Sequence, residues 1–335
     1  MIADDKHKCL VCGEAGSFLF NDPPMNVTGE AFRIFVCDNC GLGETAPIPT
    51  DLDKYYEDYH GGRHGFTAEY RGWSRARTLD KCFDNNKSSK VVLDVGFGDG
   101  TFLKHAKQRG WDIAGTERNA QLTNDDGIEV FNDLTAVKKE FGKASFDAIT
   151  CWHTLEHFAD PRKLLDEIVQ LLAPDGVLLV AVPNFGGLQS KVFGRNWLHL
   201  DVPRHLFHFT FESLGNLLLN HGFEVRRSWH YEFEYDIMGW SQSFLSSIFR
   251  KPGVFFNLLT GRAGGTGGLE KFANLILGTI ISALALPLVL IGLLARRGGT
   301  LVICAKKSTD LFMSEAEQSF IRTSRTTIHS WLILT

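Results

Sequence analysis

Residues 91–103 read VVLDVGFGDGTFL and decide the fold. A β-prone run, Val91 to Val95, leads into a turn with glycine at positions 96, 98 and 100, and a helical pattern then runs from Thr101 to Arg109. An open α/β sheet binds its ligand at a turn of this kind, between a strand and the helix that follows it. The segment therefore predicts a ligand site at the carboxyl end of a strand.

Outward from this segment, strands alternate with helices. Further strands are expected at 112–116, 128–131, 146–151, 177–182, 223–229 and 300–305, and helical patterns occupy stretches such as 161–172 and 211–220. Asp160 as N-cap and Pro161 at the first helical position mark one helix start. Helices of this length between strands predict a doubly wound α/β fold, with seven strands in a mostly parallel sheet covered on both faces.

The composition is that of a globular protein. The chain has 335 residues, 44% hydrophobic and 22% charged, which excludes wholesale disorder and a disulfide-dense toxin. The formal net charge of -4 removes the broad basic surface that a non-specific nucleic-acid binder needs.

Charge identifies the class of ligand better than glycine spacing does. Gly96 and Gly98 fit a dinucleotide fingerprint, but its third position falls on Thr101. The carboxylates of Asp94 and Asp99 repel a pyrophosphate at close range and favour a cationic ligand. Glu117 follows about twenty residues on, at the end of the next strand, where a carboxylate accepts hydrogen bonds from a ribose diol.

These residues resemble the class I S-adenosylmethionine-dependent methyltransferases, whose first motif is a hydrophobic residue followed by D-x-G-x-G-x-G and whose second strand ends in an acidic residue. The resemblance continues at 146–161 (FDAITCWHTLEHFADP), which is similar to the branch that includes the ubiquinone-pathway O-methyltransferases. It extends to 176–184 and 203–210. S-adenosylmethionine carries a sulfonium and no phosphate, in agreement with the charges.

The resemblance implies a set of cofactor contacts. The glycines would line the methionine and ribose portions, Glu117 would hold the ribose, Asp133 and Leu134 would flank the adenine, and Trp152 and His153 would lie beside the methyl group. The full implied set is Asp94, Gly96, Phe97, Gly98, Gly100, Glu117, Arg118, Asp133, Leu134, Trp152 and His153. The alternative is an α/β domain with a coincidental glycine turn.

Methyl transfer from a sulfonium is an in-line displacement, so positioning supplies much of the rate. A general base is needed only for a hydroxyl or acidic C–H acceptor, and histidine suits that role near neutral pH. His153 and His205 lie in loops where the resemblance places the substrate, so they are the candidate bases. His157, just before a helix start, is expected to be structural.

Two cysteine pairs precede this domain. Cys9 and Cys12, then Cys37 and Cys40, have the spacing of a zinc ribbon with four thiolate ligands, and each pair is followed by a glycine that permits a tight turn. A redox pair is the alternative. Paired cysteines and the absence of a secretory signal pattern favour the reducing, cytoplasmic side of the membrane.

A zinc ribbon beside a methyltransferase also suggests an RNA-modifying enzyme. Residues 1–60, however, contain four basic and eleven acidic residues. Such a module repels a phosphate backbone, so a nucleic-acid partner is not expected.

An apolar block spans 236–297. Its residues 275–294 form an uncharged run of bilayer length, and the block carries six basic and two acidic residues. In the class I fold the sixth and seventh strands are neighbours, so the block must leave the sheet and return, which excludes a single crossing. We expect monotopic attachment to the cytoplasmic face, with Trp240 as an interfacial anchor and a kink at Pro287. A dimer interface or a buried helix is the alternative.

The expected organisation is a ribbon (1–48), a helical connector (49–89), a methyltransferase domain (90–235), the apolar insertion (236–297), the last strand (298–308) and a tail (309–335). The favoured function is S-adenosylmethionine-dependent O- or C-methylation of a small or lipid-linked acceptor. The alternatives are an RNA methyltransferase and a catalytically idle, membrane-associated interaction protein on the same scaffold.

Overall fold

The structure is a computed structural model. It describes residues 7–21, 30–56, 67–83, 89–118, 127–249, 253–261 and 267–308. The predicted tail and the basic residues Arg250 and Lys251 lie outside the described residues.

The central element is a seven-stranded sheet in the order β10-β11-β8-β7-β4-β5-β6. Its strands are β4 (Val91–Val95), β5 (Asp112–Thr116), β6 (Glu129–Phe131), β7 (Phe146–Trp152), β8 (Leu172–Pro183), β10 (Phe223–Trp229) and β11 (Thr300–Lys307). The strands from β6 to β8 are parallel, whereas β11 runs antiparallel to both β8 and β10. This confirms the predicted doubly wound, Rossmann-like fold.

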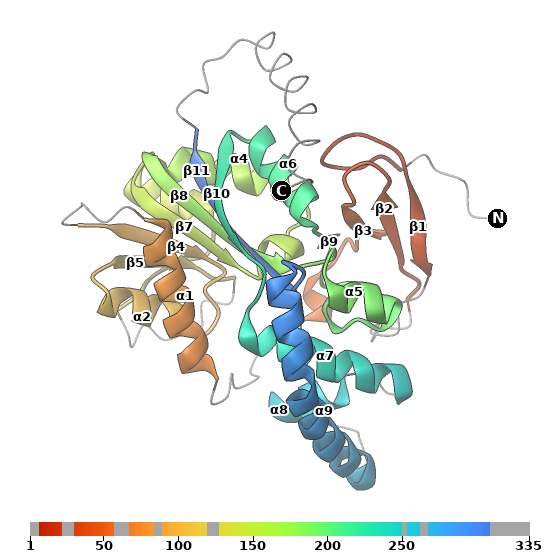
Figure 1. The fold of residues 1–335 in the computed structure, drawn as a ribbon. Coiled ribbons are helices and arrows are strands. Elements are labelled where there is room, and N and C mark those ends of the chain that lie inside the picture. The colour runs from red at the N-terminus through yellow and green to blue at the C-terminus, as the bar shows by residue number, and fades with distance from the viewer. Residues whose placement is uncertain are drawn as a thin grey trace.

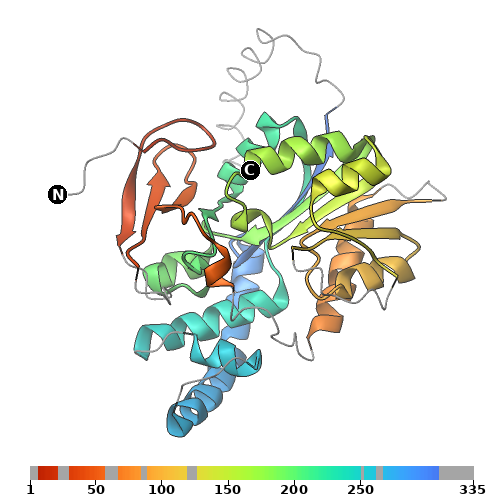
Figure 2. The same cartoon turned by 180° about the vertical axis from the view of Figure 1, so that it is seen from behind.

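Helices cover both faces of this sheet (Figures 1 and 2). One face carries α1 (Ala68–Cys82) and α2 (Thr101–Gln108), and the other carries α3 (Leu134–Phe141), α4 (Pro161–Leu171) and α6 (Phe211–Asn220). The carboxylate of Asp160 accepts a hydrogen bond from the Arg162 amide at 3.1 Å, which confirms the predicted cap of α4.

The N-terminal strands form a second, antiparallel sheet. It contains β1 (Gly16–Asn21), β2 (Arg33–Cys37) and β3 (Gly43–Ala46), and β9 (Phe207–His208) completes it. Because β9 comes from the loops after β8, the cysteine-bearing module is joined to the main domain by backbone pairing. Phe35, Leu42, Phe207 and Phe209 belong to the same hydrophobic cluster as the sheet core.

The apolar insertion projects from the carboxyl edge of the sheet (Figure 1). It consists of α7 (Phe233–Ile248), α8 (Val254–Leu259) and α9 (Gly268–Leu294), and α5 (Leu188–Phe193), which precedes it in the chain, packs against α7. Helix α9 continues through Pro287. The chain leaves the sheet along α7 and returns to it along α9. Trp240 is buried against Ala285 and Val289. The prediction that Trp240 is an interfacial anchor is therefore wrong, because its ring fills the space between the two helices.

Candidate active site

The glycine turn after β4 adopts a backbone that other residues rarely accept. Gly96, Gly98 and Gly100 have φ values of 72°, 58° and 72°. A Cβ on Gly96 would lie 2.7 Å from the Thr154 methyl, whereas a Cβ on Gly98 would meet no atom within 4 Å among the described residues. Gly98 thus borders open space, and Gly96 allows the turn to approach the loop after β7.

Glu117 follows β5 and reaches this turn. Its carboxylate accepts hydrogen bonds from the Gly98 amide at 3.2 Å and from the Arg118 amide at 2.9 Å. The Arg118 guanidinium points to Asp53, 3.3 Å away. Strands β4 and β5 are adjacent and parallel, so their carboxyl ends bring the glycine turn and the acidic residue together. The carboxylate therefore stands at the edge of the space beside Gly98.

The two aspartates of the turn have different surroundings. Asp94 is buried and accepts a hydrogen bond from the Thr150 hydroxyl at 2.6 Å, and burial raises its pKa to about 7. Asp99 is paired with Arg71 at 3.1 Å. Asp94 therefore lies beneath the turn, and its contact with a cofactor stays a prediction.

The remaining predicted cofactor contacts have structural roles in this chain. Asp133 caps α3 by accepting a hydrogen bond from the Ala136 amide at 2.7 Å. Leu134 is buried, and the Phe97 ring packs against Gly115. Their contacts with a cofactor stay predictions.

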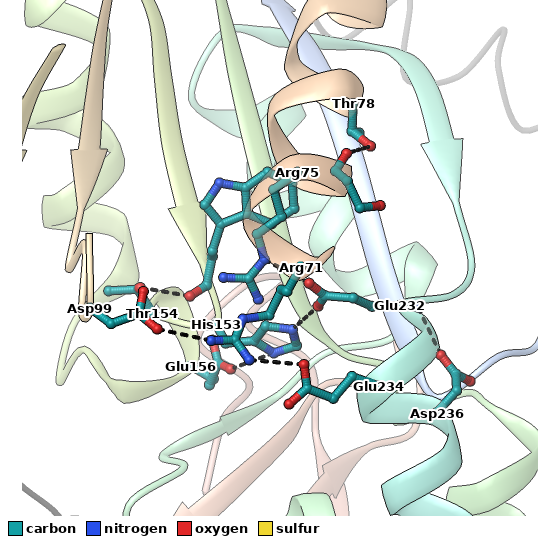
Figure 3. Close-up of polar contacts among 12 residues, drawn as sticks. Arg71, Arg75, Thr78, Asp99, His153, Thr154, Glu156, Glu232, Glu234 and Asp236 are labelled. Atoms are coloured by element: carbon teal, nitrogen blue, oxygen red, sulfur yellow. Dashed lines mark hydrogen bonds and ion pairs between the residues drawn. The ribbon is translucent and has the colours of Figure 1, made fainter. Parts of the chain in front are cut away.

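Trp152 and His153 lie where β7 ends, as Figure 3 shows for His153. His153 adopts a φ of 53°, its Nε2 lies 2.7 Å from Glu232, and its ring stacks on Tyr235 with centroids 4.2 Å apart. Its Nδ1 lies 3.6 Å from Glu156. Burial lowers the pKa of His153, but the two carboxylates outweigh burial and raise it. A raised pKa favours the protonated ring, which cannot accept a proton. The role of His153 as a general base stays a prediction.

His205 has the opposite environment. Burial lowers its pKa to about 4, so the ring is neutral at pH 7. Its Nδ1 donates to the His199 carbonyl at 2.8 Å, which leaves Nε2 as an acceptor. His205 approaches His157, with ring centroids 4.7 Å apart. A carboxylate oxygen of Glu156 and one ring nitrogen each of His157 and His205 lie within 4.8 Å of one another, which is close enough for the three atoms to share a cation.

The four cysteines predicted as metal ligands converge. The Sγ atoms of Cys9 and Cys40 are 3.5 Å apart, and Cys12 lies 3.4 Å from Cys37 and 3.7 Å from Cys40. A tetrahedral Zn²⁺ with Zn–S bonds of about 2.3 Å separates its sulfurs by about 3.8 Å. Amide groups of Val11 and Cys40 point at the sulfurs of Cys9 and Cys37. The geometry and the donor set fit a zinc ion.

Sequence reasoning missed an arginine pair on α1. Arg71 bridges Asp99 and Glu234 at 3.1 and 2.9 Å, and Arg75 donates to Glu232 at 2.6 Å (Figure 3). These bonds tie α1 to the glycine turn and to the start of α7. The arginines are four residues apart and so share a helix face, which is the signal that was available in the sequence.

Comparison with known proteins agrees with this geometry. Residues 67–228 match the family model of a methyltransferase domain. A ubiquinone biosynthesis O-methyltransferase of Azoarcus sp. strain BH72 is 27% identical over 128 residues, which cover 35% of this chain and 55% of that relative. A demethylmenaquinone methyltransferase of Deinococcus radiodurans is 32% identical over 146 residues, with coverages of 40% and 59%.

The chain thus spans little more than half the length of these relatives. Among solved structures, a SAM-dependent methyltransferase from Archaeoglobus fulgidus has 19% identity and a TM-score of 0.45, and the match covers 77% of this chain and 100% of that one. The sheet order, the glycine turn and the family match together show that residues 67–228 of this chain form an S-adenosylmethionine-dependent methyltransferase domain.

Proposed function

We propose that the protein transfers a methyl group from S-adenosylmethionine to a small or lipid-linked acceptor. The observation that carries this proposal is the open glycine turn beside the Glu117 carboxylate. An acceptor oxygen or carbon attacks the methyl carbon as the C–S bond breaks, and the bonding electron pair stays on sulfur as S-adenosylhomocysteine. The names of the relatives support a quinone-like acceptor.

For a hydroxyl acceptor, the proton must pass to a base. Burial lowers the pKa of His205 to about 4, so its ring is neutral, and its Nε2 lies 3.8 Å from Asp201. By contrast, Glu232 and Glu156 raise the pKa of His153. We assign the base role to His205 and a positioning role to His153.

Cofactor binding tests the proposal directly. Glu117→Ala removes the carboxylate that meets the ribose, so calorimetry should show S-adenosylmethionine binding about 5- to 150-fold weaker than for the wild type, or about 1–3 kcal/mol. His205→Asn is the matched control, because it should slow transfer without changing cofactor affinity. A wild-type protein that binds no S-adenosylmethionine would end the proposal.

The cysteine cluster supports a structural zinc site. Its ligands come from the loop before β1, from the last residue of β2 and from the turn that follows β2, and no open coordination position is needed. The metal would hold together a module whose own hydrophobic core is small. Four thiolates and an acidic surface do not favour a nucleic-acid partner.

The α7–α9 insertion supports attachment to a membrane surface. By length and composition, α9 could cross a bilayer. Its buried side is a narrow stripe that faces α7 and α8, namely Asn274, Gly278, Ala285, Val289 and Gly292. Apolar side chains are exposed elsewhere, at Leu269, Phe272, Leu275, Ile276, Leu277, Ile280, Leu284, Leu286, Leu288, Leu290, Ile291 and Leu294. This surface is unusually apolar for a protein surrounded by water.

Basic residues lie at the base of this insertion. Arg296 lines a 420 Å³ cavity with Lys81, Arg226 and Arg227, and Arg297 is exposed beside it. This charge suits anionic headgroups. The insertion leaves from the same sheet edge as the glycine turn, so docking on the cytoplasmic face would turn that edge towards a membrane-borne acceptor.

Vesicle flotation checks the membrane proposal. The wild type should float with vesicles of phosphatidylcholine and phosphatidylglycerol. In the double variant Phe272→Asp, Leu284→Asp the vesicle-bound fraction should fall about tenfold or more, because a charged side chain in the hydrocarbon region is costly. Leu219→Asp changes an exposed leucine of α6 and should float like the wild type. A wild type that stays with the soluble fraction as a dimer would contradict membrane docking and favour self-association.

A further inference from the structure

The 420 Å³ cavity at the base of the insertion lies between the end of α1, the edge strand β10 and the residue that follows α9. Its volume is within the range of about 300–1,000 Å³ that is usual for ligand pockets. The described wall includes no carboxylate and consists of Lys81, Val225, Arg226, Arg227, Ser228, Trp229 and Arg296. Four basic side chains in one wall favour an anionic ligand.

A β-bulge brings two consecutive arginines to this cavity. Neighbouring side chains on a regular strand point to opposite faces of the sheet. The pairing of β10 with β11 shifts by one residue between Val225 and Arg227, so Arg226 is an extra residue in β10. A bulge of this kind changes the direction of the side chains around it. Arg226 and Arg227 therefore line the same cavity although they are adjacent in the strand.

Arg296 occupies a backbone position that usually belongs to glycine. It follows the last turn of α9 with a φ of 54°. The Arg296 amide donates to the Leu293 carbonyl at 3.1 Å, and the Arg297 amide donates to the Gly292 carbonyl at 2.7 Å. Helices that end in this pattern commonly have glycine at the left-handed position, because a Cβ there is unfavourable. Arginine at this position adds a cation to the cavity in spite of the local strain.

The arginines keep donors for a ligand. Nη1 of Arg227 donates to the Lys81 carbonyl at 2.8 Å, and a guanidinium has five N–H donors, so this bond positions the group without saturating it. Arg226 lies 3.2 Å from Glu224, and both side chains are about half exposed. Exposed ion pairs contribute little free energy, so a phosphate can compete for Arg226. Guanidinium groups bind phosphate oxygens in pairs, which suits this wall.

Apolar side chains continue from the cavity along α9. Leu290 and Leu294 lie one helical turn apart and are 54% and 76% exposed. Leu294 precedes Arg296 by two residues. A cationic cavity next to an exposed apolar helix face suits a ligand that joins a phosphate to hydrocarbon chains, which is the chemistry of a lipid.

We propose that this cavity binds the phosphomonoester headgroup of a membrane lipid, whose acyl chains follow the apolar face of α9. The inference rests on the proposed attachment to a membrane surface and deepens it by naming the lipid group that is recognised. A doubly charged phosphomonoester interacts with four cations more strongly than a singly charged phosphodiester does. Binding at this end of α9 fixes the orientation of the sheet edge towards the membrane.

Flotation with two kinds of vesicle tests the headgroup. Phosphatidylcholine is mixed with either phosphatidic acid or phosphatidylglycerol, and the vesicles are matched in surface potential so that non-specific attraction is equal. The wild type should bind the phosphatidic acid vesicles about fivefold more tightly, which is the effect of one further Lys or Arg contact. Arg296→Gly should remove this preference, and glycine suits the backbone there, so the variant should fold. Arg297→Ala removes the same charge from an exposed residue outside the described wall and should keep the preference.

Calorimetry with soluble ligands separates a lipid from a free phosphate ester. Dihexanoyl phosphatidic acid, below its micelle concentration, should bind the wild type at least about tenfold more tightly than glycerol 3-phosphate, because its chains bury apolar surface. Equal affinities would show that the cavity takes a free phosphate ester, which overturns the lipid assignment.

The vesicle outcomes separate this inference from membrane attachment. A wild type that binds both kinds of vesicle equally overturns the headgroup site and leaves attachment through α9 standing. Equal loss of the preference in Arg296→Gly and Arg297→Ala indicates diffuse attraction and also contradicts the site. A wild type that floats with neither vesicle overturns the proposed attachment and this inference together.

Discussion

Removing zinc should unfold the sheet of β1, β2 and β3 while the seven-stranded sheet stays folded. Metal-coupled folding in small four-ligand modules is worth about 10–16 kcal/mol, more than the small ribbon core can replace. Once the cation is gone the sulfurs take up protons, and the cross-link between the two cysteine pairs is lost. This is the largest effect that the structure predicts.

Cys37→Ser is the sharper form of this experiment. Cys37 ends β2 and is 1% exposed, so its loss removes a ligand from the centre of the cluster. The variant should lose its one bound zinc per chain and lose hydrogen-exchange protection in β1–β3. Protection should also fall in β9, which pairs with β3. Cys82→Ala, outside the cluster, should keep both zinc and protection.

Metal analysis of the purified protein tests whether the four cysteine sulfurs bind zinc. A wild type without zinc that still protects β1–β3, or a Cys37→Ser variant that retains metal, would show that the four sulfurs do not form a structural zinc site.

His208→Gln should make stability less sensitive to acid. Burial lowers the pKa of His208 to about 3, and its Nε2 lies 3.1 Å from the Thr45 hydroxyl. The unfolded chain titrates this group near pH 6.5. As the pH falls below 6.5, the unfolded state binds a proton at this histidine and the native state does not, so the native state loses stability. Between pH 7 and pH 5 this group should cost about 2 kcal/mol.

The comparison must be between wild type and variant, since other buried groups titrate in the same range. Asp94 has a pKa raised to about 7, so its protonation stabilises the native state as the pH falls and has the opposite sign. Urea unfolding at pH 7 and pH 5 should show the variant gaining about 2 kcal/mol on the wild type at the lower pH. Parallel pH dependences would show that His208 is not buried in its neutral form.

Periodicity located the secondary structure because it depends on local sequence. Val91–Val95, Asp112–Thr116 and Phe223–Trp229 are strands with the predicted bounds, and α6 matches its predicted range. Strand β8 is longer than predicted, because it begins at Leu172, directly after α4. Pro174, Asp175 and Gly176 lie inside this strand, although residues of these types predict a turn rather than a strand.

The sequence predicted only part of the candidate site. The glycine turn and Glu117 follow consecutive strands, so the parallel fold brings them together once it is recognised. The partners of His153 are different, because Glu232 lies 79 residues away. A histidine in a loop has the sequence signature of a general base, but its neighbours set its pKa, and two carboxylates raise the pKa here.

By itself the sequence determined the fold class, the glycine turn and the convergence of four cysteines, because short-range spacing specifies each of them. The tertiary structure alone decided the directions in which the histidine pKa values shift and the burial of Asp94 and Trp240. Those properties depend on dielectric and charge from residues distant in the chain, which only the packing of helices on the sheet brings within a few ångströms.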